Sequence, residues 1–249
     1  MILFQVVAVP ALILRKNDLA DVLWGPAFPL SAIAAVIWGA GGFDQVGARS
    51  LLMVGLVTIW ATRLFLHVGI RNLTAGHEDV RYNNWRKAWG KTWVWRSYLQ
   101  VFTLQPLILF LFLTPLLLVI SLPPTGMTVI AWIGLAVWLT GVILESVSDE
   151  QLRMFKSKPD SRGKLMTTGL WSWSRHPNYF GEVLSWWGIW LMVIDLDYGW
   201  MTVISPIGVT FLILKVSGVS MLEDLMKNRP GYDEYCRRTS QFVPMPPKK

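Results

Sequence analysis

Long apolar runs separated by short polar segments dominate this sequence. A helix that spans a membrane needs roughly 20 apolar residues, and seven runs come near that length. They cover residues 1–14, 22–41, 50–70, 98–121, 127–147, 178–194 and 199–219. Pro123 and Pro124 separate the fourth run from the fifth, because a proline pair breaks a helix. The pattern predicts an all-α protein, a polytopic membrane bundle of about seven transmembrane helices.

The composition agrees with a membrane protein and excludes several other classes. Of the 249 residues, 53% are hydrophobic and only 16% are charged, whereas globular proteins are usually about 25% charged. This excludes a disordered chain, a collagen-like fibre and an ordinary soluble enzyme. The single cysteine, Cys236, excludes internal disulfides, iron–sulfur clusters and cysteine-based zinc sites. Since the three histidines are scattered and no linker divides the chain, we expect no metal site and one domain over residues 1–249.

Basic residues gather in a few polar segments. All 23 lysines and arginines except Arg49 and Arg63 lie just after the first run, in 71–97, in 148–177, or from 215 onward. With seven spans these segments fall on one side of the membrane, and membrane proteins keep their basic loops in the cytoplasm. The pattern predicts an N-terminus outside and a cytoplasmic C-terminus. Because topology explains this placement, we expect no nucleic-acid partner.

Three stripes of polar residues lie in the apolar runs or at their ends, and ionisable residues in a membrane span are functional candidates by default. Their members are three or four residues apart and so share a helical face: Arg63, His67 and Arg71; Glu145, Asp149, Arg153 and Lys156; Asn178 and Glu182. Such stripes either satisfy one another across the bundle or line a polar cavity that opens to the cytoplasm. A cavity of this kind suits a large anionic ligand. No G-x-G-x-x-G or Walker A pattern accompanies it, so a Rossmann or P-loop site is not expected.

One string of residues carries a resemblance to a known family. Residues 169–182, which end in Arg-His-Pro-Asn-Tyr-Phe-Gly-Glu, resemble the membrane-embedded steroid 5α-reductase superfamily, and its bacterial branch in particular. The resemblance is strongest over 140–245, the expected cofactor-binding half, and reaches back through 17–25, 60–67 and 78–82. The resemblance to the bacterial branch favours a bacterial inner membrane as the location, whereas the charge pattern alone fits a bacterial inner membrane and an endoplasmic reticulum equally. The chain is more distantly similar to the isoprenylcysteine carboxyl methyltransferases and the sterol C14 reductases.

The resemblance implies NADPH as the cofactor, in a cavity at the cytoplasmic ends of the helices. In the family, hydride passes from NADPH to an activated C=C bond. By resemblance, Asn178 and Glu182 hold the nicotinamide and ribose region, and basic residues engage the phosphates, for which arginine and lysine are natural partners. The implied cofactor-binding residues are Arg71, Glu145, Asp149, Arg153, Lys156, Lys164, Arg175, His176, Asn178, Tyr179, Glu182, Glu223 and Tyr235.

The substrate implied is a lipophilic α,β-unsaturated carbonyl compound, steroid-like or an enoyl lipid. Hydride addition builds negative charge on its carbonyl oxygen, which a nearby donor or cation stabilises. The steroid enzymes use a glutamate and a tyrosine; here the nearest acid is Asp21, and Trp60, which cannot act as an acid, stands at the tyrosine position. We predict Asp21, kept protonated by burial, with Arg63 or His67 as the catalytic groups, and Tyr179 as an alternative donor. The departure argues against a Δ4-3-keto steroid as the natural substrate.

Two other functions fit parts of the sequence. The isoprenylcysteine carboxyl methyltransferases share an Arg-His-Pro-x-Tyr-x-Gly string but bind S-adenosylmethionine, which has no phosphates. Asn178, Glu182 and the basic residues Arg153, Lys156 and Lys164 favour NADPH instead. The third possible function is that of a non-catalytic protein that binds a sterol or lipid. The presence of both Asn178 and Glu182 argues against this function. The predicted partners are therefore a lipophilic small molecule and membrane lipid.

Overall fold

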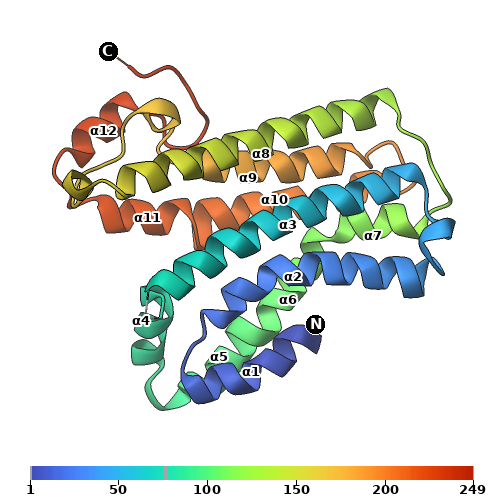
Figure 1. Ribbon diagram of the computed structural model, residues 1–249, viewed down its shortest axis with the longest axis horizontal. Helices are drawn as coiled ribbons and strands as arrows, with labels where there is room; N and C mark the ends of the chain where they lie inside the picture. Colours follow the sequence, from blue (N-terminus) through green and yellow to red (C-terminus); the bar gives the residue numbers. More distant parts are fainter. Residues whose placement is uncertain (1, 76–77, 249) are drawn as a thin grey trace. The chain divides into compact units, whose positions relative to one another are not determined.

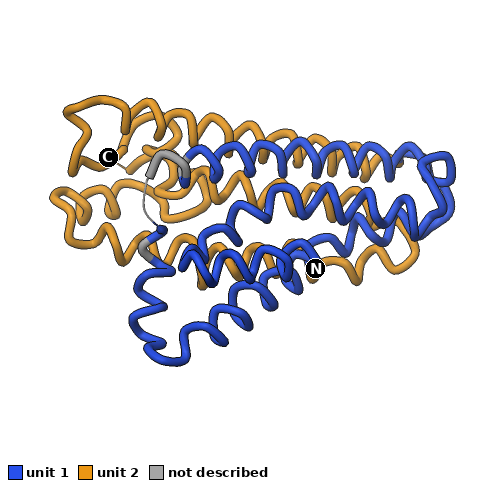
Figure 2. The backbone as a smooth tube through the Cα atoms, turned by 60° about the horizontal axis from the view of Figure 1, so that its bottom comes forward, with its two compact units in different colours: residues 1–127 blue, residues 128–249 orange. Residues whose placement is uncertain are grey.

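The protein is predominantly helical. Its structure is a computed structural model that describes residues 2–75 and 78–248, apart from the side chains of residues 71, 73–75 and 80. Within these ranges no strand occurs, so the predicted all-α class is confirmed. The chain forms two compact units, residues 1–127 and residues 128–249 (Figure 2). The second unit includes residues 140–245, the expected cofactor-binding half.

The first unit consists of helices of very different lengths. Its α-helices (Figure 1) are α1 (Ile2–Leu14), α2 (Leu19–Ala34), α3 (Ala48–Ala75), α4 (Val80–Trp89), α5 (Trp93–Ser97), α6 (Leu104–Phe112) and α7 (Thr114–Ser121). Short π-helical segments follow α2 and α5, at Ala35–Gly39 and Tyr98–Thr103. The chain bends by 54° between α6 and α7. The break lies at Leu113, and Pro115 occupies the first turn of α7, where a proline begins a helix but cannot continue the preceding one.

Helices α2 and α3 pack closely because of one glycine and two aromatic residues. A side chain at Gly25 would overlap Phe65, so the glycine lets the two backbones approach. Phe28 of α2 packs edge-on against Trp60 of α3, with ring centroids 5.4 Å apart, and both residues are buried. Edge-to-face rings favour each other beyond the apolar area that they bury. Trp60 is therefore a packing residue of the first unit.

The second unit contains two long helices followed by shorter ones. They are α8 (Val129–Lys156), α9 (Pro177–Leu191), α10 (Ile204–Phe211), α11 (Val219–Met226) and α12 (Tyr232–Arg238). Thr128 caps α8 by accepting the Ala131 N–H, and Pro177 occupies the first turn of α9, where its missing N–H costs nothing. A π-helical segment, Leu212–Val216, extends α10.

Glycines hold α8 and α9 in direct contact. A Cβ atom at Gly141 would lie 2.6 Å from the Gly181 carbonyl oxygen, and one at Gly181 would lie 2.6 Å from the Glu145 nitrogen. Gly134 and Gly188 form the same kind of approach two turns away. The two helices therefore run side by side (Figure 1) with their backbones touching, which small residues permit in membrane proteins.

Substitution of Gly181 by valine is expected to destabilise the second unit by about 3 kcal/mol or more, because the new side chain meets backbone that cannot move aside. Thermal unfolding of the detergent-solubilised protein measures the effect. Gly55 on α3 serves as the control, because a Cβ atom there has no neighbour within 4 Å. Gly55→Ala is expected to be neutral or slightly stabilising. Equal melting temperatures for both variants would contradict the close approach.

Several helices are long and apolar enough to cross a membrane. In the described residues there are four, Leu19–Gly39, Ala48–Ile70, Val129–Lys156 and Gly199–Met226, or five if the bent pair 81–112 and 114–121 forms one span. The protein is thus a multi-pass membrane protein, but the predicted count of seven is not confirmed. The difference lies in α1 and α9, whose 13 and 15 residues fall short of a full crossing.

Candidate functional site

Two of the predicted polar stripes meet between α8 and α9. The Nδ2 atom of Asn178 donates a hydrogen bond to Asp149 Oδ1 at 3.0 Å. Glu145, one turn before Asp149, is buried with 5% exposure and lies where Gly181 brings the α9 backbone against α8. Glu182 lies one turn after Asn178 and is half-buried. The structure therefore brings Asn178 and Asp149 into contact, with Glu182 and Glu145 one turn away along their own helices.

Asn178 has one side-chain atom that the protein leaves unsatisfied. Its Oδ1 is buried, and within the described part of the chain it has no hydrogen-bond donor. The orientation of the amide follows from its other contact, because a carboxylate such as Asp149 only accepts hydrogen bonds. A buried carbonyl oxygen without a donor is costly. The arrangement suits a ligand that carries an N–H group.

The basic residues predicted to bind phosphate lie in exposed positions near the end of α8. Arg153, one turn after Asp149, donates two hydrogen bonds to Glu150, at 2.7 and 2.6 Å. Lys156 and Lys164 are also exposed. All three are accessible to an anion in solution, and Arg153 shares its charge with Glu150.

A second cluster secures the segment before α9 to the end of the chain. Arg175 forms a two-pronged ion pair with Glu223, with N–O distances of 2.9 and 2.8 Å, and also donates to the Thr239 carbonyl at 3.0 Å. His176 Nε2 lies 2.8 Å from Glu223 Oε1. Tyr235 donates to the Trp171 carbonyl at 2.6 Å. These four predicted cofactor residues satisfy one another and the backbone, so their contacts fix the position of the α9 N-terminus.

The charge states of this cluster follow from burial and from Glu223. Burial lowers the pKa of the His176 imidazole, and the hydrogen bond and charge of Glu223 offset this only in part. Burial also lowers the pKa of Arg175, but the hydrogen bonds and charge of Glu223 outweigh it and the net pKa is raised. Burial raises the pKa of the Tyr235 phenol. At neutral pH the cluster therefore contains a neutral imidazole, a charged guanidinium and a protonated phenol.

The second unit is expected to lose stability as the pH falls below the ordinary histidine pKa of about 6.5. Since burial lowers the pKa of His176 in the folded state, the unfolded chain binds the proton more readily, and acid favours unfolding. One such proton contributes at most about 1.4 kcal/mol per pH unit. Melting temperatures between pH 7.5 and 5.5 measure the slope. His176→Gln should flatten it, and an unchanged slope in that variant would assign the effect to other groups.

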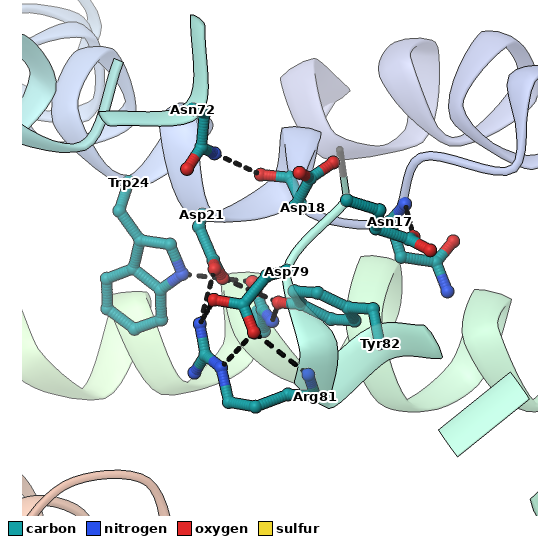
Figure 3. A network of polar contacts seen from close by, with 10 residues as sticks. Asn17, Asp18, Asp21, Trp24, Asn72, Asp79, Arg81 and Tyr82 are labelled. Atoms are coloured by element: carbon teal, nitrogen blue, oxygen red, sulfur yellow. Dashed lines mark hydrogen bonds and ion pairs between the residues drawn. The ribbon is translucent and has the colours of Figure 1, made fainter. Parts of the chain in front are cut away.

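A further network occupies the first unit, around Asp21 (Figure 3). Asp21 accepts hydrogen bonds from Arg81 Nη2 at 2.8 Å and from the Tyr82 hydroxyl at 2.5 Å. Gln105 donates to the Tyr82 hydroxyl at 3.3 Å, and Trp24 donates to Gln105 at 3.0 Å. From the sequence we predict a protonated Asp21 that donates, whereas in this network Asp21 accepts both bonds. Tyr82, which is not among the site residues predicted from the sequence, is 2% exposed and belongs to the network.

Asp79 explains why these groups converge. It caps α4 by accepting the Arg81 N–H at 2.9 Å, and it accepts a second bond from Arg81 Nε at 3.0 Å. The cap fixes the first turn of α4, which carries both Arg81 and Tyr82. In the sequence, the signal for this site is the family resemblance over residues 78–82.

The remaining predicted residues occupy scattered positions. Arg63 is half-buried and His67 is exposed, one turn apart on α3, and the side chain of Arg71 lies outside the described residues. Tyr179 stacks on His176 with ring centroids 5.9 Å apart. The α3 stripe belongs to the first unit and the other stripes to the second, so a single cavity shared by all three stays a prediction. The described residues contain no group of three or more metal-ligating side chains that could hold an ion.

The chain is similar to proteins with different descriptions. An uncharacterised protein of Schizosaccharomyces pombe is 26% identical over 92% of this chain and 73% of its own length. A probable O-methyltransferase of Ustilaginoidea virens is 29% identical over 45% of this chain and 34% of its own. The human 3-oxo-5-alpha-steroid 4-dehydrogenase 1 is 38% identical over 22% of each chain. The chain thus spans about a third or less of the two relatives that are named as enzymes.

No solved structure matches this chain significantly. Similarity to a protein family, in contrast, covers nearly the whole chain. Residues 8–239 match the family described as proteins of unknown function, DUF1295. This range includes both the Asp21 network and the α8–α9 site. The chain therefore belongs to the DUF1295 family, the steroid 5-alpha-reductase-like family.

Proposed function

We propose that the protein is an integral membrane reductase that uses NADPH to reduce the C=C bond of a lipophilic α,β-unsaturated carbonyl compound, either steroid-like or an enoyl lipid. Membership of the steroid 5-alpha-reductase-like family supports a membrane reductase, as does the similarity to 3-oxo-5-alpha-steroid 4-dehydrogenase 1. The observation that carries the proposal is the buried Asn178 Oδ1, which has no donor within the described part of the chain.

The α8–α9 site fits the nicotinamide end of NADPH. A carboxamide N–H group satisfies the Asn178 oxygen, and Asp149 keeps the Asn178 side chain in the orientation that presents it. Glu145 and Glu182 are acceptors for ribose hydroxyls. When bound, NADPH supplies the hydride, and the protein supplies orientation and electrostatics.

The exposed basic residues fit the phosphate end. The ion pair of Arg153 with Glu150 is exposed, with side-chain exposures of 70% and 51%. Such a pair contributes little stability, so a phosphate group competes for the arginine. Lys156 and Lys164 add two further cations. Arg175, His176, Glu223 and Tyr235 then act as positioning residues, because their contacts hold the segment that starts α9.

We propose Arg63 and His67 as the catalytic groups. Asp21 is then a hydrogen-bond acceptor that holds the side chains of Arg81 and Tyr82 in place. Because Asp21 accepts bonds from Arg81 and Tyr82, we assign the donor at the substrate carbonyl to Arg63 or His67. Either one would stabilise the negative charge that grows on that oxygen. Arg63→Ala and His67→Ala are expected to lower turnover while NADPH binding persists.

The orientation is also a proposal. The basic segments favour an N-terminus outside and a C-terminus in the cytoplasm of a bacterial inner membrane, with α1 and α9 completing seven crossings and the active site open to the cytoplasm. In inside-out vesicles, trypsin is expected to remove the basic tail after Lys227, and in sealed spheroplasts it is expected to leave the tail intact.

A methyltransferase is the second candidate, because the probable O-methyltransferase of Ustilaginoidea virens matches 45% of the chain. Its cofactor would be S-adenosylmethionine, which carries no phosphate. The carboxylates between α8 and α9 suit either cofactor, whereas Arg153, Lys156 and Lys164 favour the phosphorylated one. The two functions therefore differ in a measurable cofactor preference.

Titration of the purified full-length protein with NADPH and, separately, with S-adenosylmethionine distinguishes the two functions. Ligand-dependent thermal stability is the readout, since a ligand that binds the folded state raises the melting temperature. We expect stabilisation by NADPH that weakens in Lys164→Ala and Glu182→Ala. Lys248→Ala, an exposed tail residue, serves as the matched control. Stabilisation by S-adenosylmethionine alone would refute the reductase, and stabilisation by neither would refute both.

A further inference from the structure

A basic and aromatic patch in the first unit lies outside the proposed site. Arg15, at the end of α1, has a left-handed backbone with φ 55°, which ends the helix and allows the Lys16 N–H to bond the Ala11 carbonyl at 2.9 Å. The Arg15 carbonyl accepts a bond from Arg86 of α4 at 2.6 Å. The end of α1 is thereby joined to the α4–α5 segment.

Cations in this patch lie over indole rings. The guanidinium groups of Arg15 and Arg86 both lie over Trp93, at 5.8 and 5.2 Å from its centre, and that of Arg96 lies over Trp95 at 5.7 Å. The ring quadrupole attracts each cation. Two like charges nevertheless share one ring, and the carboxylate of Glu78 offsets only the charge of Arg86.

The patch carries a surplus of positive charge. Arg86 is paired with Glu78 at 2.6 Å. In the described part of the chain, Arg15, Lys87, Lys91 and Arg96 form no ion pair. The sequence contains no acidic residue from position 80 to position 144 that could neutralise them.

Two hydrogen-bond donors in the patch are also unused. The Nε atoms of Arg86 and Arg96 are buried and have no acceptor among the described residues. A buried charged donor without an acceptor is costly. Phosphate oxygens are acceptors with the charge and geometry that arginine favours.

Exposed aromatic and apolar side chains surround these cations. Trp85, Trp95 and Tyr98 are 43%, 54% and 43% exposed, and Val94 and Leu99 are exposed to a similar degree. Tryptophan and tyrosine next to lysine and arginine are typical of the level of the lipid headgroups. Residues 81–112, which include this segment, form the first part of the bent candidate span. The apolar side chains favour a lipid over a soluble anion.

We propose that Arg15, Lys87, Lys91 and Arg96, with Trp93 and Trp95, form a binding site for the phosphate headgroup of an anionic glycerophospholipid. The cations and the free Arg96 Nε engage the phosphate, and the exposed aromatic rings lie at the boundary between headgroup and acyl chains. The proposal does not rest on the proposed reductase function, since none of these residues belongs to the α8–α9 site or the Asp21 network.

Native mass spectrometry of the delipidated full-length protein in detergent tests the proposal. Dioleoylphosphatidylglycerol and dioleoylphosphatidylcholine are added in parallel, and retained lipid adducts are counted. We expect selective retention of phosphatidylglycerol by the natural protein. A triple variant, Arg15→Gln/Lys91→Gln/Arg96→Gln, should weaken this retention at least about tenfold. Each basic residue near an anionic membrane surface raises the affinity roughly fivefold.

A matched control removes the same charge elsewhere. Arg229→Gln/Arg238→Gln/Lys248→Gln alters three exposed basic residues of the tail and should keep the selectivity. The charge-preserving variant Arg15→Lys/Arg96→Lys should retain more of the selectivity than the glutamine variant does, which separates loss of charge from misfolding. The triple glutamine variant of the patch should bind NADPH with unchanged affinity. The lipid site and the proposed reductase function are therefore tested independently.

Several outcomes would overturn the site. Equal retention of the two lipids removes the case for an anionic headgroup. Equal loss in the patch and tail variants assigns selectivity to net charge alone. If millimolar inorganic phosphate displaces the bound lipid as effectively as added phosphatidylglycerol does, the patch is a phosphate site and not a lipid site. Persistence of selectivity in the patch variant would place the lipid elsewhere.

Discussion

Replacement of Glu223 by alanine is expected to destabilise the second unit by about 3–5 kcal/mol, because removal of one partner leaves a buried charge unpaired. Glu223 accepts two bonds from Arg175 and one contact from His176, and the side chains of these two residues are only 9% and 1% exposed. Arg175 also donates to the carbonyls of Thr239 and Cys236. Loss of the carboxylate therefore loosens the tail and the start of α9 together. Thermal or denaturant unfolding in detergent measures this effect.

The neighbouring residue Asp224 provides the control. It pairs with Lys227 at 3.3 Å, and the two side chains are 76% and 61% exposed. Because exposed ion pairs contribute at most about 1 kcal/mol, Asp224→Ala should change the stability little. Glu223→Gln, which keeps the shape and loses the charge, should fall between the two. If Glu223→Ala unfolds at the same temperature as Asp224→Ala, the bidentate ion pair between Arg175 and Glu223 does not stabilise the C-terminal segment.

Replacement of Asn178 by aspartate is expected to weaken NADPH binding by about a hundredfold. The change turns the hydrogen bond to Asp149 into a contact between two carboxylates, and like charges at this distance repel or force one group to take a proton. The side chain then loses the orientation in which its oxygen is presented to the carboxamide. Asn178→Ala, which removes the amide without adding charge, should cost about tenfold.

Affinity and stability have to be measured together for these variants. Fluorescence titration gives the NADPH dissociation constant, and thermal unfolding without ligand shows whether the α8–α9 contact persists. Asn83→Asp on α4 is the matched control, since Asn83 is exposed and lies in the other unit. Unaltered NADPH affinity in Asn178→Asp, with wild-type stability, would remove Asn178 from the cofactor site.

The α8–α9 site was predictable in part. The resemblance over residues 169–182, with the one-turn spacing of Glu145 and Asp149 and of Asn178 and Glu182, identified the residues. Spacing along a helix is a local property, so it determines which residues share a face. The hydrogen bond between Asn178 and Asp149 was not predictable, because it depends on how closely Gly181 lets the two helices approach.

The Asp21 network shows a different limit. Burial suggested a protonated Asp21 that donates, but Arg81 and Tyr82 both donate to it. These partners lie about 60 positions away in the chain, and the Asp79 cap brings them into place. A residue's role as donor or acceptor depends on such neighbours, and the sequence around Asp21 does not name them.

The sequence by itself determined that this protein is a multi-pass helical membrane protein, because the length and apolarity of a run decide whether a helix can cross a bilayer. Only the tertiary structure decided which runs are long enough as helices, since α1 and α9 end after 13 and 15 residues. It also decided that Arg175 and His176 bind Glu223, 48 and 47 residues further along. The physical reason is that pairing depends on distance in space, and helix packing sets that distance.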